Sequence, residues 1–225
     1  TPPAGSTKKL DTHFFSDIIT TIKEHSNQPS LIVAMFGSAF FLFLGAFFQL
    51  NMIPYAVYSL QLTDVQGGYL FLLTAIGIGA GALFAGRISG KVVELGLVPL
   101  AGLGVVLCCY ILDLLSEQLF AVIPLVVLLG MFGGMYQIPL DSFIQVASPQ
   151  KSRGKVVAAT NFMSFTGVLA ASGLLYVLSE WVGLSPDKNF TVIGTMTLFI
   201  TVVIAFQYYD YLTRFIGMIL SKLHF

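Results

Sequence analysis

The chain has 225 residues, of which 56% are hydrophobic and only 10% are charged, and its formal net charge is zero. Soluble domains carry about 25% charged residues, so this chain has too few charges to cover a surface that faces water. A neutral balance also argues against nucleic acid as a partner, because phosphate binding needs a concentrated positive face. The composition therefore predicts an integral membrane protein whose partner over most of its length is the lipid bilayer.

Six apolar stretches without charged residues follow one another along the chain. Each is close to the length of about 20 residues that a helix needs to cross the hydrocarbon core while satisfying its own backbone hydrogen bonds. No stretch alternates polar and apolar residues with period two, which excludes a strand barrel. The predicted fold is all-α with six transmembrane helices. The spans are expected at residues 31–58 and 65–86, between Glu94 and Asp113, between Glu117 and Asp141, between Lys155 and Glu180, and between Lys188 and Asp210.

Lys and Arg fall almost entirely on one side of the predicted spans. Six spans place both chain ends on the same side, and ten of the eleven basic residues fall there, whereas only Lys188 falls on the other side. Because cytoplasmic loops carry an excess of Lys and Arg, both termini are predicted to be cytoplasmic, in a multi-pass protein of the cell inner membrane. The ten basic residues are Lys8, Lys9, Lys23, Arg87, Lys91, Lys151, Arg153, Lys155, Arg214 and Lys222.

Two amphipathic segments flank the spans. Apolar residues recur every four positions from Leu10 to Ile22, and a second stripe begins at Leu212. Such helices usually lie in the membrane interface. The alternative is a helix that packs on a neighbouring soluble domain, which shows the same apolar stripe. The opening residues resemble a linker, which predicts that the chain is a piece of a longer polypeptide. The predicted division is a cytoplasmic linker with an amphipathic helix at 1–29, the six-helix domain at 30–209 and a cytoplasmic amphipathic tail at 210–225.

The sequence contains no motif for catalysis, metal binding or cofactor binding. His13, His25 and His224 lie far apart and outside the spans, so they do not suggest an active site. We therefore expect this segment to have no catalytic residue, no metal site and no cofactor, and not to be an enzyme. The remaining classes are transport, anchoring and assembly.

Small residues inside the spans are assigned to packing. Cys108 and Cys109 are neighbours in an apolar run, where small buried side chains are their expected use. In the second span, two pairs of glycines have the small-xxx-small spacing that lets membrane helices approach closely. These pairs are Gly77 with Gly81 and Gly86 with Gly90.

Polar side chains inside the spans are the candidate site residues, because they are costly in lipid and usually line a cavity or bond to a neighbouring helix. The residues predicted to line a substrate cavity are Gln49, Asn51, Gln137 and Asn161. Hydrogen bonding between helices is the alternative for each of them. Asp141 is assigned to the interface, where water would solvate it, and with Pro139 it belongs to the predicted cytoplasmic turn that continues to Lys155.

Basic residues at the cytoplasmic ends of the spans are predicted to form a gate. They are Arg87, Lys91, Arg153 and Lys155. Positive-inside topology alone would also explain their position, and contact with anionic lipid is a further alternative.

Three segments resemble a known family. Residues 76–102, IGIGAGALFAGRISGKVVELGLVPLAG, are similar to the cytoplasmic loop signature of the major facilitator superfamily, in the form used by its lysophospholipid transporter branch. Residues 136–162, YQIPLDSFIQVASPQKSRGKVVAATNF, resemble that branch's connection between its tenth and eleventh helices. Residues 41–56 resemble its seventh helix. The branch's Arg-Gly and Asn-Phe pairs are matched by Arg153-Gly154 and Asn161-Phe162. Two positions depart from the pattern, with Gly86 in place of a common Asp and Asp141 in place of a usual Asn.

The resemblance implies that the six helices are the C-terminal half of a twelve-helix transporter and form two inverted three-helix repeats. It implies a lysophospholipid or another amphiphile as substrate, bound near the midplane against the N-terminal six-helix half of the same chain. Some members of the branch also carry a fused acyltransferase or acyl-activating domain. The alternatives are a facilitator for a small polar solute or drug, which a charged residue in the cavity would favour, and a membrane anchor of a fused lipid acyltransferase. No charged residue is expected at mid-span.

Overall fold

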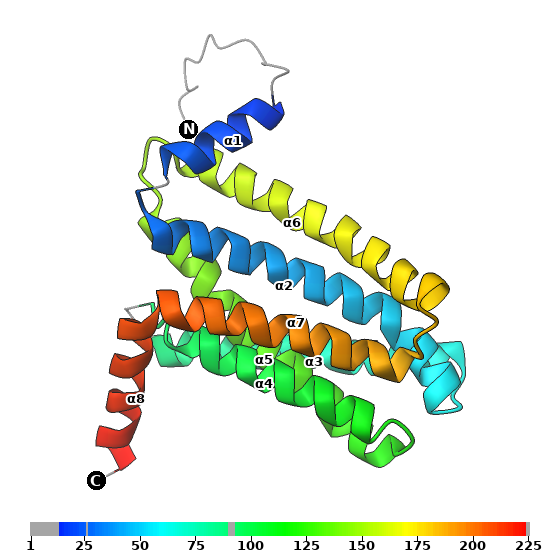
Figure 1. The fold of residues 1–225 in the computed structure, drawn as a ribbon. Coiled ribbons are helices and arrows are strands. Elements are labelled where there is room, and N and C mark those ends of the chain that lie inside the picture. Colours follow the sequence, from blue (N-terminus) through cyan, green and yellow to red (C-terminus); the bar gives the residue numbers. More distant parts are fainter. Residues whose placement is uncertain (1–13, 26, 90–92, 224–225) are drawn as a thin grey trace, which may run out of the picture.

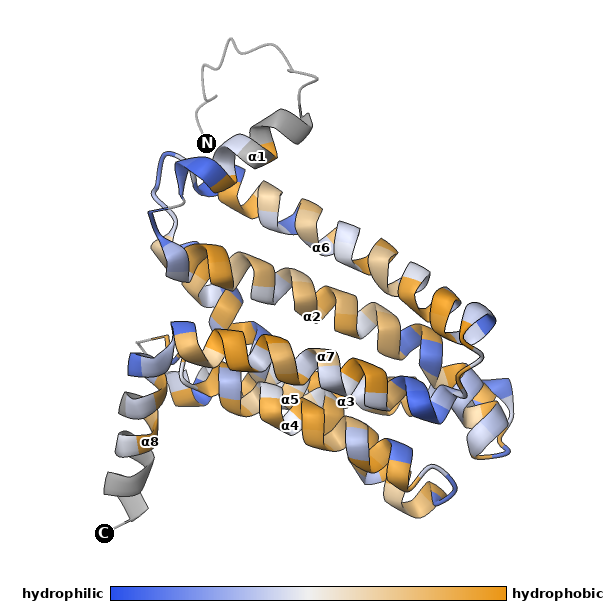
Figure 2. Cartoon of the chain, in the orientation of Figure 1, coloured by the Kyte–Doolittle hydropathy of each residue, from blue (hydrophilic) through white to orange (hydrophobic). Residues whose placement is uncertain are grey.

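The computed structural model describes residues 14–25, 27–89 and 93–223, and within them all regular elements are helices. Six helices are long and apolar enough to cross a membrane, which confirms the predicted fold class. Figure 2 shows hydrophobic colour along the spans and hydrophilic colour concentrated at their ends, as a lipid surround requires. The spans are α2 (Pro29–Pro54, continued by the π-helical turn Tyr55–Ser59), α3 (Asp64–Ser89), α4 (Leu97–Leu114), α5 (Leu119–Ala147), α6 (Arg153–Tyr176, continued by the π-helical turn Val177–Trp181) and α7 (Pro186–Gln207). The flanking helices are α1 (Phe14–Glu24) and α8 (Tyr209–Leu223).

The observed spans differ from the prediction where charged residues lie inside a helix. α5 continues past Asp141 to Ala147, so residues 139–141 are helical and their assignment to the cytoplasmic turn is wrong. The non-helical connection comprises only residues 148–152, and Lys155 already belongs to the first turn of α6. A helix in lipid must keep its backbone hydrogen bonds until it reaches water, so a charged side chain near one end does not stop it.

The spans form two groups of three helices, α2–α4 and α5–α7, that pack against each other reciprocally (Figure 1). α3 packs most extensively against α5, and α6 packs against α2, so the second helix of each group contacts the first helix of the other. α4 lies between α5 and α7 and contacts both. This exchange of contacts is the arrangement expected of two inverted repeats.

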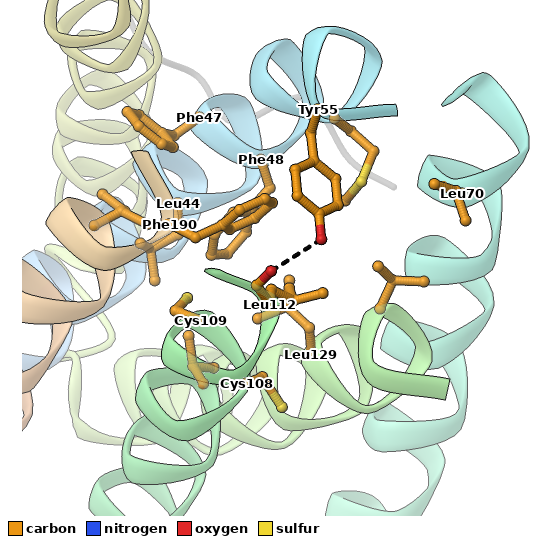
Figure 3. Packing of buried hydrophobic residues seen from close by; sticks show 14 of the residues in the cluster. Leu44, Phe47, Phe48, Tyr55, Leu70, Cys108, Cys109, Leu112, Leu129 and Phe190 are labelled. Carbon is orange, nitrogen blue, oxygen red and sulfur yellow. Dashed lines mark hydrogen bonds between the residues drawn. The ribbon is translucent and has the colours of Figure 1, made fainter. Parts of the chain in front are cut away.

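Two buried apolar clusters stabilise the bundle, one toward each end. At the end where α2 stops, the Tyr55 hydroxyl donates a hydrogen bond of 2.9 Å to the Leu112 carbonyl oxygen (Figure 3). At the other end, the Tyr208 hydroxyl donates one of 2.8 Å to the Ser30 carbonyl oxygen. Each buried phenol therefore has the partner that a polar group in an apolar core needs. The first cluster includes Phe47, Phe48, Cys108, Cys109, Leu129 and Phe190, which gives the two cysteines their predicted packing role.

α3 and α5 approach so closely that only glycine fits at four positions. A Cβ atom on Gly77 or Gly81 would collide with a backbone carbonyl oxygen of α5, which confirms the predicted packing of this pair. The same holds in reverse for two glycines of α5, Gly130 and Gly134. The other predicted pair differs, since a Cβ on Gly86 would meet nothing within 4 Å and Gly90 lies outside the described residues.

The amphipathic segments at the chain ends contact the bundle. α1 packs against the start of α6 (Figure 1) and buries Ile18 in the apolar cluster at that end. α8 runs at a steep angle to α7 and buries Phe215 in the same cluster. Residues 10–13 of the predicted N-terminal helix lie outside the described part of the chain.

Candidate functional site

A polar cavity of about 330 Å³ lies between α2, α5 and α6, nearer the end of the bundle that carries α1 and α8. Gln137 and Asp141 are four residues apart, so they lie on the same face of α5, and Asn161 of α6 contributes to the same wall. Two of the predicted cavity residues, Gln137 and Asn161, are thus brought together. The polar lining consists of Ser38, Gln137, Asp141, Gln145, Thr160, Asn161 and Ser164, and the apolar lining of Leu42, Ile144, Val157 and Phe165.

Three of these side chains form a hydrogen-bonded triangle. The Gln137 Nε2 atom donates to Ser38 Oγ at 2.8 Å and to Asp141 Oδ1 at 2.7 Å. Ser38 Oγ in turn donates to Asp141 Oδ1 at 2.9 Å. Hydrogen bonds to a carboxylate are short and strong, so the triangle fixes the Asp141 side chain while α2 and α5 hold it from two sides.

Two oxygen atoms of these three side chains accept no hydrogen bond from the described residues. Both hydrogen bonds to the carboxylate go to Oδ1, and Asp141 Oδ2 accepts none from the described residues. Gln137 Oε1 is buried and has no partner there either. The site therefore keeps unused acceptor capacity beside a carboxylate.

Asp141 lies inside a membrane-spanning helix rather than in the predicted turn. The last residue of α5, Ala147, lies six positions after Asp141, which corresponds to about 9 Å along the helix axis. Ionisable residues inside spans are rare and usually mark substrate or ion pathways. Asp141 was assigned to the interface, where water would solvate it, and this assignment is corrected because its side chain lines the polar cavity.

An apolar cavity of about 280 Å³ adjoins the polar one. The two share Leu42 of α2. The apolar lining extends farther from the α1 end, from Tyr136 back to Leu129 on α5 and to Val168, one turn beyond Ser164, on α6. Gln49 is exposed in this second cavity. The rest of its lining includes Phe41, Leu44, Gly45, Phe48, Phe71, Thr74, Ile78, Val105, Leu129, Tyr136 and Thr197.

Asn51, the remaining predicted cavity residue, lies away from both cavities. Its side chain is 1% exposed. Asn51 Nδ2 donates to the Pro186 carbonyl oxygen at 2.8 Å, and Asn189 Nδ2 donates to Asn51 Oδ1 at 2.9 Å. These bonds join the far end of α2 to the first turn of α7.

The predicted gate residues lie at the α1 end of the bundle. Arg87 lies in the last turn of α3, and Arg153 and Lys155 lie in the first turn of α6. All three are exposed. Arg87 Nη1 donates at 3.5 Å to the Leu83 carbonyl oxygen of its own helix. Within the described residues none of the three forms an ion pair. Lys91 lies outside the described residues, and the gating role of the whole set stays a prediction.

Sequence reasoning missed Ser38 and the part that Asp141 plays. The available signal was spacing, since Ser38, Leu42, Gly45 and Gln49 follow one another at intervals of four, three and four residues and so share one face of α2. Which face of α5 meets it depends on helix packing, which spacing alone does not give.

Six apolar helices in two reciprocally packed groups, with a polar cavity open inside them, define a multi-pass membrane protein of the transporter class. A family model described as Major Facilitator Superfamily matches residues 1–172, more than half of the 225 residues and the whole lining of the polar cavity. The chain belongs to the major facilitator superfamily, a family of secondary membrane transporters. No curated protein and no solved structure matched the chain.

Proposed function

We propose that these helices form the C-terminal half of a transporter that moves a lysophospholipid across or between the leaflets of the inner membrane. The observation that carries the proposal is the adjoining pair of cavities, one polar and one apolar, that share Leu42. A lysophospholipid has one polar head and one acyl chain, so it needs both surroundings at neighbouring places. A solute that is polar throughout would have no use for the apolar cavity.

The order of the cavities gives the bound lipid a direction. The polar cavity is nearer the basic residues of the α6 start, and the apolar cavity is nearer the middle of the bundle. We assign the head group to Gln137 and Asn161 and the acyl chain to the apolar cavity beside Gln49. Arg153 and Lys155 at the mouth would attract the phosphate and act as the gate.

The same proposal includes an N-terminal six-helix half as partner. α3 and α6 are the least buried of the six spans. Only 28% and 17% of the most apolar 18-residue stretch of each is buried within the bundle. Large apolar side chains on them, among them Leu83 and Leu169, are exposed. A second half packed over α3 and α6 would cover these faces and close the cavities from the side.

A facilitator for a small polar solute is the second candidate, and Asp141 favours it. A carboxylate inside the cavity suits a solute that carries a positive charge or several hydrogen-bond donors. The apolar cavity does not contribute to that function, which is why we rank the lysophospholipid first.

Uptake into vesicles would test the two candidates. The full-length protein is reconstituted, and uptake of a labelled lysophospholipid is compared with uptake of the same head group without its acyl chain. We expect the lysophospholipid to be taken up, and we expect an excess of the chain-free head group to inhibit this uptake only weakly. Equal uptake of the chain-free compound would favour the polar solute, and uptake of neither would leave the role of a membrane anchor for a fused acyltransferase.

A further inference from the structure

We infer that the polar cavity binds a monovalent cation against Asp141. The cavity contains one carboxylate, and no basic side chain of the described residues lies within 4 Å of it. A charge inside a span is costly unless something pairs with it. A cation in the cavity would supply that pairing.

The atoms left free in the triangle are suitable ligands. Asp141 Oδ2 and Gln137 Oε1 both have unused acceptor capacity within the described structure, and Ser38 Oγ lies 2.9 Å from the carboxylate. All three are oxygen atoms, the ligand type that hard cations prefer. The same atoms would also accept hydrogen bonds from an ammonium group.

The charge balance selects a monovalent ion. One carboxylate neutralises one positive charge, and Asp141 is the only acidic side chain in the described lining of the cavity. A divalent ion would leave a net positive charge in a medium of low dielectric constant, and Ca²⁺ sites usually combine several carboxylates. The cavity is therefore built for an alkali-metal ion or an ammonium group.

Two sources can supply this cation. One is a free ion such as Na⁺, which would bind whether or not a lipid is present. The other is an ammonium group on the head of the transported amphiphile, and only this second source rests on the proposed function.

Thermal unfolding of the full-length protein in detergent would test the inference. Sodium chloride, or ethanolamine hydrochloride in a parallel series, replaces choline chloride at constant ionic strength and constant pH. A ligand that binds only the folded state raises Tm in a saturable way. We expect a saturable rise of several degrees with at least one of the two cations.

The variant Asp141→Asn removes the charge but keeps an oxygen that can accept from Ser38 and Gln137, and it should lose the rise in Tm. Asp210→Asn is the matched control, because Asp210 is exposed in the first turn of α8, and it should keep the rise. If Asp141→Asn does not fold, Ser38→Ala keeps the carboxylate and should raise the midpoint concentration of the cation roughly fivefold, the equivalent of one lost hydrogen bond.

A rise with Na⁺ but not with ethanolamine identifies a free ion, and a rise with ethanolamine but not with Na⁺ identifies an ammonium group. A rise with both supports one site that accepts either monovalent cation. No rise with either cation, or a rise that survives in Asp141→Asn, would overturn the inference. Failure of lysophospholipid uptake in vesicles would contradict the proposed function while leaving a Na⁺-dependent rise untouched.

Discussion

The two asparagines predicted to line the cavity differ in what their side-chain amides do. Asn161 is exposed in the polar cavity, and within the described residues its amide has no hydrogen-bond partner. Asn51 is buried and makes two hydrogen bonds to the start of α7. An amide without a partner in a spanning helix must meet water or a ligand, whereas a paired amide connects helices. The two positions therefore form a matched pair for mutation.

For Asn161→Leu we expect lower uptake with little change in stability. The change keeps similar bulk, removes the amide from the cavity wall, and breaks no hydrogen bond of the described structure. Loss of one hydrogen bond to the substrate is worth about 1 kcal/mol, or roughly a fivefold fall in uptake at low substrate concentration. Uptake per folded molecule in reconstituted vesicles measures this effect. Unchanged uptake per molecule would remove Asn161 from the proposed site.

For Asn51→Leu we expect the opposite pattern. The change removes both hydrogen bonds of the Asn51 side chain to α7, and interhelical hydrogen bonds in membranes are worth about 0.6 kcal/mol each. Stability should fall by roughly 1 kcal/mol and the yield of folded protein should fall with it. Unfolding in detergent and uptake per folded molecule are measured together. A lower uptake per molecule at normal stability would show that Asn51 belongs to the transport path.

At the scale of helices, the glycine contact between α3 and α5 controls how closely the two groups of spans approach. We expect Gly81→Ala to destabilise the bundle, because the new methyl group would collide with the backbone of α5 and overpacking of this kind costs about 1–3 kcal/mol. Gly79→Ala is the control on the same helix, since a Cβ there meets nothing within 4 Å. Thermal unfolding of both variants would show the contrast, and equal Tm values would remove the packing role of Gly81.

The number and order of the helices could be predicted from sequence, because lipid demands long apolar runs and tolerates few charges between their ends. Helix ends were less predictable for the same reason. Charged residues were taken as boundaries, but Asp141, Lys155 and Glu180 all lie within helical segments. Backbone hydrogen bonding decides where a spanning helix ends, and a single charged side chain near the end does not override it.

The candidate site was predictable only in part. Depth and polarity pointed to Gln137 and Asn161, because an amide far from a helix end has few uses in lipid. Ser38 and Asp141 are 103 residues apart in sequence, and only the contact of α2 with α5 brings them together. The same contact turns Asp141 into a cavity residue, whereas its position near the end of an apolar run favoured a solvated surface.

At the scale of the whole molecule, the bundle has two chemically different ends. The end with α1 and α8 holds the exposed basic residues of α3 and α6 (Figure 1). The opposite end holds Asp64, Asp113, Glu117, Glu180, Asp187 and Lys188. Lys188 is paired there with Asp113, its Nζ atom lying 2.8 Å from Oδ1. The acidic residues of that end therefore still outnumber its basic residue. Since basic loops stay in the cytoplasm during insertion, we propose that the α1 end faces the cytoplasm.

Cysteine labelling would test this orientation with two variants, Lys23→Cys at the α1 end and Glu117→Cys between α4 and α5, both at exposed positions. The background is favourable, because Cys108 and Cys109 are at most 3% exposed. In right-side-out vesicles, a maleimide that does not cross membranes should label Glu117→Cys and spare Lys23→Cys. Inverted vesicles should give the reverse, because a bundle with an even number of spans keeps α1 and α8 on one side. Labelling of Lys23→Cys from outside would show that the orientation is the opposite of the proposed one. The direction assigned to the head group and acyl chain of the bound lipid would then be reversed as well.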